Sequence, residues 1–218
     1  MLCETDWELR DLIAPAHTAL VVSAMQNDYC HSEGLIAKAG FSMKMTHEMA
    51  PRLAGLIAHA QEAGVKVVRI RYEMTEKLPH LPTLRKLKQL GISELIARPG
   101  TWGWQWFDEY PEFVPSEEDI VVAAPSFSAF TGTALDLILR GFGIRTLVFG
   151  GVTTNGAIEF TARTAFELNY HVVLVEDCAA AREEWMHRAA VWNFQKLYGD
   201  VISSDQLVKF WSANAERR

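Results

Sequence analysis

The chain has 218 residues, of which 49% are hydrophobic and 22% charged, a composition typical of soluble globular proteins. Its 21 Lys and Arg against 27 Asp and Glu give a formal net charge of −6, and no basic cluster is available to neutralise nucleic-acid phosphates. No apolar stretch is long enough to span a bilayer, and acidic residues stand where a signal peptide carries basic ones. We therefore expect a cytoplasmic protein with no nucleic-acid and no membrane partner.

Short β-branched runs alternate with helical patterns along the whole chain, which is typical of an α/β domain built on a parallel sheet. We predict a single domain over residues 1–218, with a six-stranded, mostly parallel sheet between two helical layers. The predicted strands cover residues 18–23, 65–71, 120–123, 146–149 and 172–175, with 201–202 as the candidate for the sixth. The predicted helices cover residues 45–63, ending at Gly64, and then 132–140, 157–168 and 184–198.

An aromatic-rich insertion at about residues 72–118 interrupts this alternation. It contains the run PGTWGWQWF, in which Gly and Pro disfavour a long helix. Exposed aromatic residues in a long loop are typical of a lid or an interface. The alternative is that they cover a small hydrophobic cluster of their own.

Ligands of open parallel sheets bind beyond the carboxyl ends of the strands, near the point where the strand order reverses. Three segments follow predicted strands, and their sequences are AMQNDYC (24–30), APSFSAFTGT (124–133) and GGVTTNGAIEFTA (150–162). The first offers the polar side chains Gln26, Asn27 and Asp28. The third is a turn that opens a helix, so its backbone N–H groups are available to a ligand.

Standard cofactor and metal motifs are missing from the sequence. The glycines of GGVTTNG do not match a dinucleotide fingerprint, no phosphate-binding loop occurs, and neither H-E-x-x-H nor C-x-x-C is present. We therefore expect no cofactor and no metal. Cys3, Cys30 and Cys178 are odd in number and far apart, which favours reduced, structural thiols.

The motifs AMQNDYC and PSFSAFTGTALDLILRGFGIRTLVFGGVTTN resemble those of the isochorismatase-like cysteine hydrolases, and the resemblance runs over essentially the whole chain. Within that family, RPGTWGWQWFDE and the run VVLVEDCAA after Asn169 and Tyr170 are most similar to ureidoacrylate amidohydrolases and biuret hydrolases. The resemblance implies the family's three-layer, Rossmann-like fold and a homo-oligomer, either a dimer or a tetramer. It also implies hydrolysis of C–N bonds in small ureido or carbamoyl compounds.

Catalysis in this family uses a Cys nucleophile, an Asp that moves the proton, and a Lys that lowers the thiol pKa. By resemblance, the Asp position falls on Ala24, the Lys position on Ala124 and the Cys position on Ala157. The resemblance also implies a cis peptide at Val152–Thr153, with nearby backbone N–H groups forming the oxyanion hole. A methyl group can be neither nucleophile, base nor cation, so we predict that this chain does not hydrolyse the family's substrates.

Two accounts of the three alanines remain open. Alanine at all three positions favours deliberate substitution in an engineered chain with an active parent. The alternative is a natural, non-hydrolytic protein that kept the fold for binding or for another reaction. A third hypothesis for the function is a vinyl-ether hydrolase of the isochorismatase type. Such an enzyme can lack the Cys but normally retains the Asp, so Ala24 argues against this hypothesis. The hydroxyls of Ser126, Ser128, Thr153 and Thr154 lack a recognisable adjacent base.

The remaining site is predicted to bind a small ureido or amide ligand. Its candidate contact residues are aromatic side chains along the loops and polar groups near the turns, namely Gln26, Asn27, Tyr29, Trp102, Phe127, Phe130, Thr153, Thr154 and Asn155. For Gln26, Asn27 and Asn155, bonding to turn backbone is an equally good interpretation. By the resemblance, Asp28 belongs to the scaffold of its motif.

Overall fold

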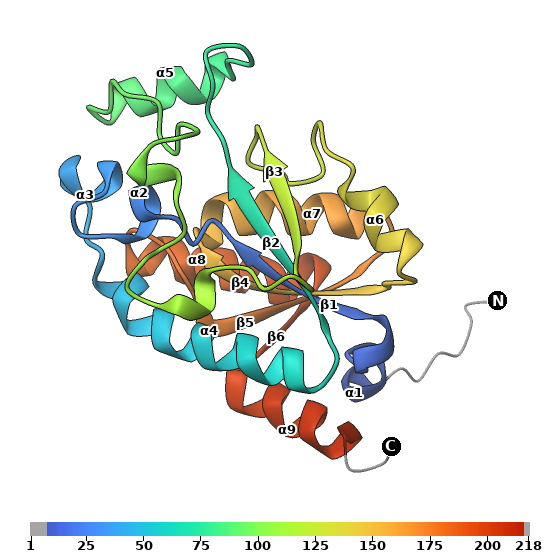
Figure 1. Ribbon diagram of the computed structural model, residues 1–218. Helices are drawn as coiled ribbons and strands as arrows, with labels where there is room; N and C mark the ends of the chain where they lie inside the picture. Colours follow the sequence, from blue (N-terminus) through green and yellow to red (C-terminus); the bar gives the residue numbers. More distant parts are fainter. Residues whose placement is uncertain (1–7, 216–218) are drawn as a thin grey trace.

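Six parallel strands form one sheet in a computed structural model that describes residues 8–215 (Figure 1). The strands are β1 (Thr18–Ser23), β2 (Lys66–Tyr72), β3 (Ile120–Ala124), β4 (Thr146–Val152), β5 (His171–Ala180) and β6 (Asp200–Ile202). Their order across the sheet is β3-β2-β1-β4-β5-β6, and every neighbouring pair is parallel. The predicted three-layer α/β fold is confirmed, including the sixth strand.

Helices cover both faces of the sheet (Figure 1). One face carries α4 (Lys44–Glu62) and α9 (Ser204–Ala215), and the other carries α6 (Leu135–Gly141), α7 (Glu159–Glu167) and α8 (Glu184–Asn193). The short helices are α1 (Leu9–Leu12), η1 (Pro15–His17), α2 (Asn27–Cys30), α3 (Leu35–Lys38), α5 (Leu81–Gln89), η2 (Trp102–Trp104) and η3 (Pro111–Phe113). Two wide π turns complete the fold, η4 (Thr154–Ile158) and η5 (Phe194–Tyr198).

Burial explains why these segments take these forms. All six residues of β1 and all seven of β4 are buried, as strands covered on both faces should be. Helix α4 buries one apolar side that includes Leu53, Leu56, Ile57 and Ala60. The helix ends before Gly64, which has a φ of +74° and donates its N–H to the carbonyl of Gln61, as the sequence predicts.

The strand order reverses direction at β1, which lies between β2 and β4. The chain leaves β1 toward β2 on one side, and it later returns to β4 on the other. Gly151 at the end of β4 has a φ of +107°, and a Cβ there would lie 2.2 Å from the Ser23 carbonyl oxygen. A glycine is therefore required for the close approach of β4 to β1, where the sheet opens to a ligand.

The insertion predicted at about residues 72–118 divides between two hydrophobic clusters. Leu87, Ile92 and Ile96 form a small cluster with Ile36 and Met43. Phe107 and Phe113 are instead fully buried in the main core, with ring centroids 6.0 Å apart.

Three predicted helices differ from the observed ones. The segment predicted over residues 157–168 begins as the π turn η4, the helix predicted over 184–198 ends in the π turn η5, and the one predicted over 132–140 begins only at Leu135. Within residues 8–215, no helix is both long and apolar enough to cross a membrane.

Candidate active site

The three alanines lie at the carboxyl ends of β1, β3 and β4. Ala24 directly follows β1 with a φ of +52°, Ala124 is the last residue of β3, and Ala157 lies in η4 after β4. Their exposed fractions are 2%, 0% and 7%. Any charged group at these positions would therefore be withdrawn from water.

Hydroxyl groups from three segments surround these positions. Tyr72, in register with Ala124 at the end of β2, donates its hydroxyl to the Phe127 carbonyl at 2.8 Å. Burial raises the pKa of Tyr72 to about 12, and hydrogen bonding with Thr161 and Ser23 acts in the opposite direction. The phenol is therefore neutral at ordinary pH.

Ser23 and Thr161 direct their hydroxyls to the same turns. Ser23 Oγ donates to the Val152 carbonyl at 3.0 Å, just before η4. Thr161 Oγ1 donates to the Ala157 carbonyl at 2.7 Å and accepts the Ala129 N–H at 3.1 Å. The surroundings of the alanines are thus a network of neutral hydroxyls and backbone groups, in which no formal charge needs a partner.

The turn after β4 has the backbone form that the family resemblance implies. The Val152–Thr153 peptide is cis. The Thr153 carbonyl accepts the N–H groups of Gly156 and Ile158, at 3.0 and 3.2 Å. Thr153 and Asn155 are half-buried, whereas Thr154 is fully buried.

Thr154 has an imidazole partner that sequence reasoning missed. Its Oγ1 lies 2.8 Å from Nδ1 of His187 on α8. Burial lowers the pKa of His187, with Glu184 acting in the opposite direction, so the imidazole is neutral at pH 7. A histidine 33 residues along the chain, on an otherwise ordinary helix, gives no local signal.

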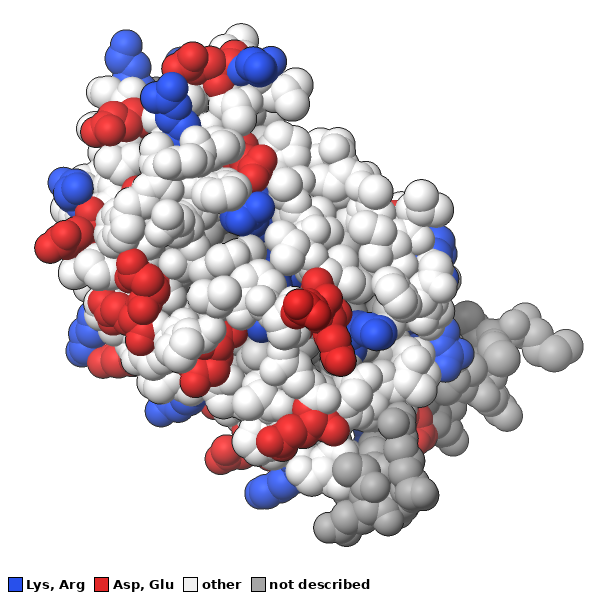
Figure 2. Space-filling view, viewed as in Figure 1, with Lys and Arg blue, Asp and Glu red and all other residues white. Residues whose placement is uncertain are grey.

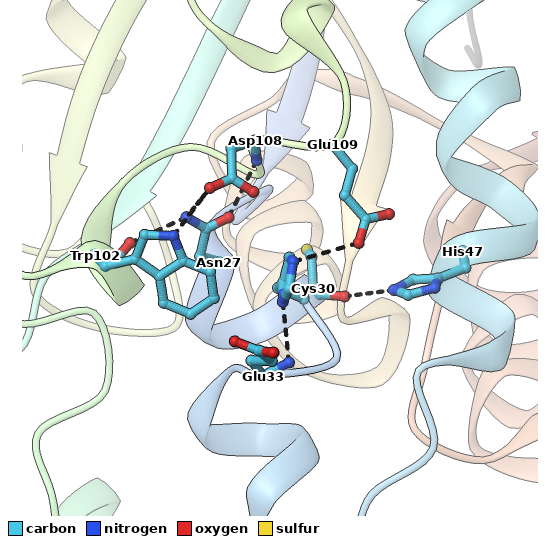
Figure 3. Close-up of polar contacts among 8 residues, drawn as sticks. Asn27, Cys30, Glu33, His47, Trp102, Asp108 and Glu109 are labelled. Carbon is cyan, nitrogen blue, oxygen red and sulfur yellow. Dashed lines mark hydrogen bonds and ion pairs between the residues drawn. The ribbon is translucent and has the colours of Figure 1, made fainter.

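The amides of Gln26 and Asn27 bind the insertion. Gln26 Nε2 donates to the carbonyls of Tyr72 and Trp104, and its Oε1 accepts the Tyr72 N–H at 2.8 Å. Asn27 Nδ2 donates to the Trp102 carbonyl and to Asp108, whose N–H returns to Asn27 Oδ1 at 3.1 Å (Figure 3). Both side chains are fully buried, and they use their hydrogen bonds within the protein.

Asp28 also binds the insertion, and it connects the insertion to α3. Its carboxylate accepts the Ala97 N–H at 2.7 Å and the Leu35 N–H at 3.2 Å. Gly103 packs directly against it, since a Cβ there would lie 2.1 Å from Asp28 Cγ. These contacts agree with the scaffold role that the resemblance implies.

Trp102 lies at the outer edge of this region, 39% exposed. Its indole N–H donates to Asp108 at 2.9 Å, and its ring meets His31 edge-on at 4.9 Å. His31 Nε2 in turn lies 3.5 Å from Glu109 Oε1. Trp102 is thus fixed by polar contacts while its ring still faces solvent.

The other three aromatic candidates for ligand contact lie in different parts of the structure. Tyr29 meets Tyr72 edge-on at 6.4 Å, and burial raises the pKa of Tyr29. Phe127 is 40% exposed and packs on Phe160 at 5.4 Å. Phe130 instead packs at 6.0 Å on Tyr170, directly before β5, so it lies toward the opposite end of the sheet from the alanines.

Neither thiol in the described residues is positioned as a nucleophile. Cys30 is fully buried with Sγ 3.6 Å from the Ala24 carbonyl, and burial raises its pKa. Burial, with the nearby Asp177 carboxylate, raises the pKa of Cys178 to about 12. Cys3 lies outside the described residues. Within residues 8–215, no three His, Cys, Asp or Glu side chains are grouped to hold a metal ion.

Arg182 is a second residue that the sequence did not reveal. It follows β5, is half-buried, and stacks its guanidinium over Phe41 at 4.4 Å. Burial lowers its pKa, and the nearby Tyr29 acts in the opposite direction. In the described part of the chain no carboxylate pairs with it. A half-buried guanidinium without a counterion is suited to bind an anionic group of a ligand.

Comparison with known proteins gives consistent matches. The family model described as the isochorismatase domain matches residues 18–206. Ureidoacrylate amidohydrolase RutB from Acinetobacter baylyi is 33% identical over 94% of this chain and 87% of its own length. The protein of that name from Pantoea ananatis is 35% identical over 87% of this chain and 80% of its own length.

Solved structures share the fold. A cysteine hydrolase from Pseudomonas syringae pv. phaseolicola has a TM-score of 0.79 and 21% identity, covering 93% of this chain and 96% of its own. N-carbamoylsarcosine amidase from Thermoplasma acidophilum has a TM-score of 0.70 and 28% identity, covering 87% of this chain and 97% of its own.

Proposed function

This chain belongs to the isochorismatase family, and from that premise we propose that it binds a small ureido or carbamoyl compound without hydrolysing it. The ligand class is supported by relatives named ureidoacrylate amidohydrolase. The loss of hydrolysis rests on one observation: alanine stands at residues 24, 124 and 157, the positions where the family resemblance implies an Asp, a Lys and a Cys.

Among residues 8–215, no other group near the three alanines is placed to supply the missing nucleophile and acid. Hydrolysis of a carbamoyl C–N bond requires a nucleophile that attacks the carbonyl carbon and an acid that protonates the leaving nitrogen. The Thr154 hydroxyl has a neutral imidazole beside it but is fully buried. The Cys30 thiol is buried as well, and its raised pKa keeps it protonated.

We place the ligand between the turn after β4 and the loops that follow β1 and β3. Arg182 would bind a carboxylate such as that of ureidoacrylate, with Tyr29 and Phe127 as apolar walls. Thr153 and Asn155, which are half-buried, would supply polar groups of the turn, and Trp102 would lie at the entrance. The predicted contact of Thr154 is not kept, because its buried hydroxyl bonds to His187. Gln26 and Asn27 would act indirectly, by holding the insertion in place.

Calorimetric titration with ureidoacrylate tests binding directly. We expect saturable binding without ammonia release, and weakening by roughly 10- to 150-fold in Arg182→Gln, the loss of one charge-assisted hydrogen bond. Arg85→Gln, an exposed arginine on α5, serves as the matched control and should bind as the unchanged chain does. Absence of binding, or equal affinity in Arg182→Gln, would refute this placement.

Restoring the three side chains tests the relation to the hydrolases. The triple variant Ala24→Asp, Ala124→Lys and Ala157→Cys should release ammonia from ureidoacrylate or biuret. The variant with Asp and Lys but no Cys is the control and should remain inactive. If the triple variant is active, the result supports an active parent hydrolase whose three residues were replaced, by engineering or naturally. If the triple variant is inactive, the result favours a repurposed binding protein. Asp, Lys and Cys codons at these positions in the native gene would identify the alanines as engineered.

We further propose that the protein is a cytoplasmic homo-oligomer, a dimer or a tetramer. Trp185 and Trp192 on α8 are 66% and 59% exposed, and Phe160 on α7 is 53% exposed. Large aromatic side chains left in water favour burial against a second copy. Light scattering should give a mass above 24.5 kDa, and Trp185→Arg with Trp192→Arg should lower it.

A further inference from the structure

A second cavity lies at the amino ends of β1, β4 and β5, at the opposite edge of the sheet from the three alanines. Its volume is about 420 Å³, within the range of small-molecule sites. Its polar lining includes the side chains of His17, Arg140, Arg145, Tyr170 and His171, together with one carboxylate, that of Asp11. Leu12 and Ile144 contribute apolar surface.

The parallel sheet itself brings the basic residues together. His17 directly precedes β1, Arg145 directly precedes β4, and His171 begins β5. The Arg145 N–H donates to the His17 carbonyl at 2.8 Å, and the His171 N–H donates to the Arg145 carbonyl at 2.9 Å. Since β1, β4 and β5 are neighbours in the sheet, these residues form one row across its edge.

Two groups in this row lack the partners that their chemistry requires. Nδ1 of His17 is buried and has no hydrogen-bond partner among residues 8–215. No ion pair links the exposed Arg145 to a carboxylate in the same part of the chain. Arg140 differs, because its Nε lies 3.0 Å from Asp136 and its guanidinium also donates to the Leu168 carbonyl.

The charges in the cavity lining at pH 7 are those of Arg140, Arg145 and Asp11, because both histidines are neutral. Burial lowers the pKa of His17, and the positive charge of Arg145 acts in the same direction. Burial also lowers the pKa of His171, where Arg145 opposes protonation and Asp200 favours it. The chain as a whole has a net charge of −6, and acidic and basic side chains are interspersed over the face in Figure 2. Within residues 8–215, Arg145 is the cationic group of this lining that no ion pair to a carboxylate offsets, whereas Arg140 is paired with Asp136.

We propose that this cavity binds a small anionic molecule through a phosphate or carboxylate group, held by the Arg145 guanidinium and the His17 imidazole. Arg145 would supply the charge and a forked pair of donors, and Nδ1 of His17 would gain the partner that it lacks. The organic part of the ligand would lie against Leu12 and Ile144. This site is separate from the proposed ureido site, since the two occupy opposite ends of the sheet.

The test follows the imidazole resonances of the full chain by NMR during titration with inorganic phosphate, and separately with acetate. Ionic strength is held constant with chloride. We expect saturable shifts of His17 and His171, and no shift of the exposed His59, with at least one of the two probes. Arg145→Gln should weaken the binding by at least about tenfold, whereas Arg85→Gln and Arg182→Gln should leave it unchanged.

Each outcome bears on the proposal. A response to phosphate alone identifies a phosphoryl ligand, and a response to acetate identifies a carboxylate. No saturable shift with either probe, or equal affinity in Arg145→Gln, would overturn it. The folding of the Arg145→Gln variant is checked from its unchanged His59 resonance, so loss of binding is distinguished from unfolding.

Discussion

The buried carboxylate of Asp28 should contribute to stability through the two backbone N–H groups that it accepts. Asp28 is 6% exposed and accepts the N–H groups of Ala97, from the insertion, and Leu35, from α3. In Asp28→Ala both donors lose their acceptor. The Ala97 N–H is buried, so leaving it without an acceptor should lower the free energy of unfolding by about 1–3 kcal/mol. The Leu35 N–H is partly buried and can bond to water instead, so the loss of its acceptor should lower it by about 0.5–1.5 kcal/mol. Together the two losses lower the free energy of unfolding by roughly 1.5–4.5 kcal/mol.

Asp28→Asn is the matched variant, because it has the same shape and keeps one acceptor oxygen. That oxygen can still accept the Ala97 N–H, so only the weaker hydrogen bond from the Leu35 N–H is lost, at about 0.5–1.5 kcal/mol. Urea denaturation followed by tryptophan fluorescence measures both values. The exposed Glu117→Ala is a control for removing a carboxylate and should change stability by less than about 0.5 kcal/mol. The reasoning fails if Asp28→Ala is as stable as the control, or if Asp28→Asn is the less stable of the pair.

Three other predictions concern buried polar groups. Tyr72→Phe should destabilise the fold by about 1–2 kcal/mol in urea denaturation, because the Phe127 carbonyl loses its donor, and an unchanged midpoint would contradict this. Asp119→Ala should cost about 3–5 kcal/mol in the same assay, since it strands the Arg69 guanidinium, which pairs with Asp119 at 2.7 Å and is 1% exposed. Stability should fall as the pH drops below about 6.5, because the lowered pKa of buried His187 lets the unfolded chain bind the proton first. His187→Gln should flatten that slope in thermal scans taken from pH 7 to pH 5.

The arrangement of strands and helices could be predicted because it follows from periodicity and burial. The fully apolar run of β1 and the Gly64 stop of α4 are local signals, and the structure has both. The wide turns η4 and η5 could not be predicted in this way. In η5, for example, the Gly199 N–H bonds to the Phe194 carbonyl, five residues back, and apolar spacing hardly distinguishes this from an ordinary helical turn.

The sequence motifs located the positions of the three alanines but not the groups around them. Ser23 bonds to Val152 across 129 residues, and Tyr72 bonds to Phe127 across 55. Such hydrogen-bonded pairs form only when the sheet has assembled, so no local sequence pattern predicts them. Arg182 was missed for the same reason, because it is recognised by its burial and by the absence of an ion pair to any carboxylate of residues 8–215, and not by its neighbours in the chain.

The burial of Ala24 and Ala124 gives a physical reason why the Asp and the Lys that the family resemblance implies at these positions would be lost together. Both side chains lie where water does not reach, so an Asp or a Lys there depends on the other for its counter-charge. Losing one alone would strand a buried charge, at a cost of about 3–5 kcal/mol. Losing both leaves only the neutral hydroxyls of Ser23, Tyr72 and Thr161, which are satisfied by backbone groups. The fold therefore leaves no buried charge unpaired around Ala24 and Ala124. An Asp at residue 24 and a Lys at residue 124 would avoid the cost of an unpaired buried charge only if both were introduced together.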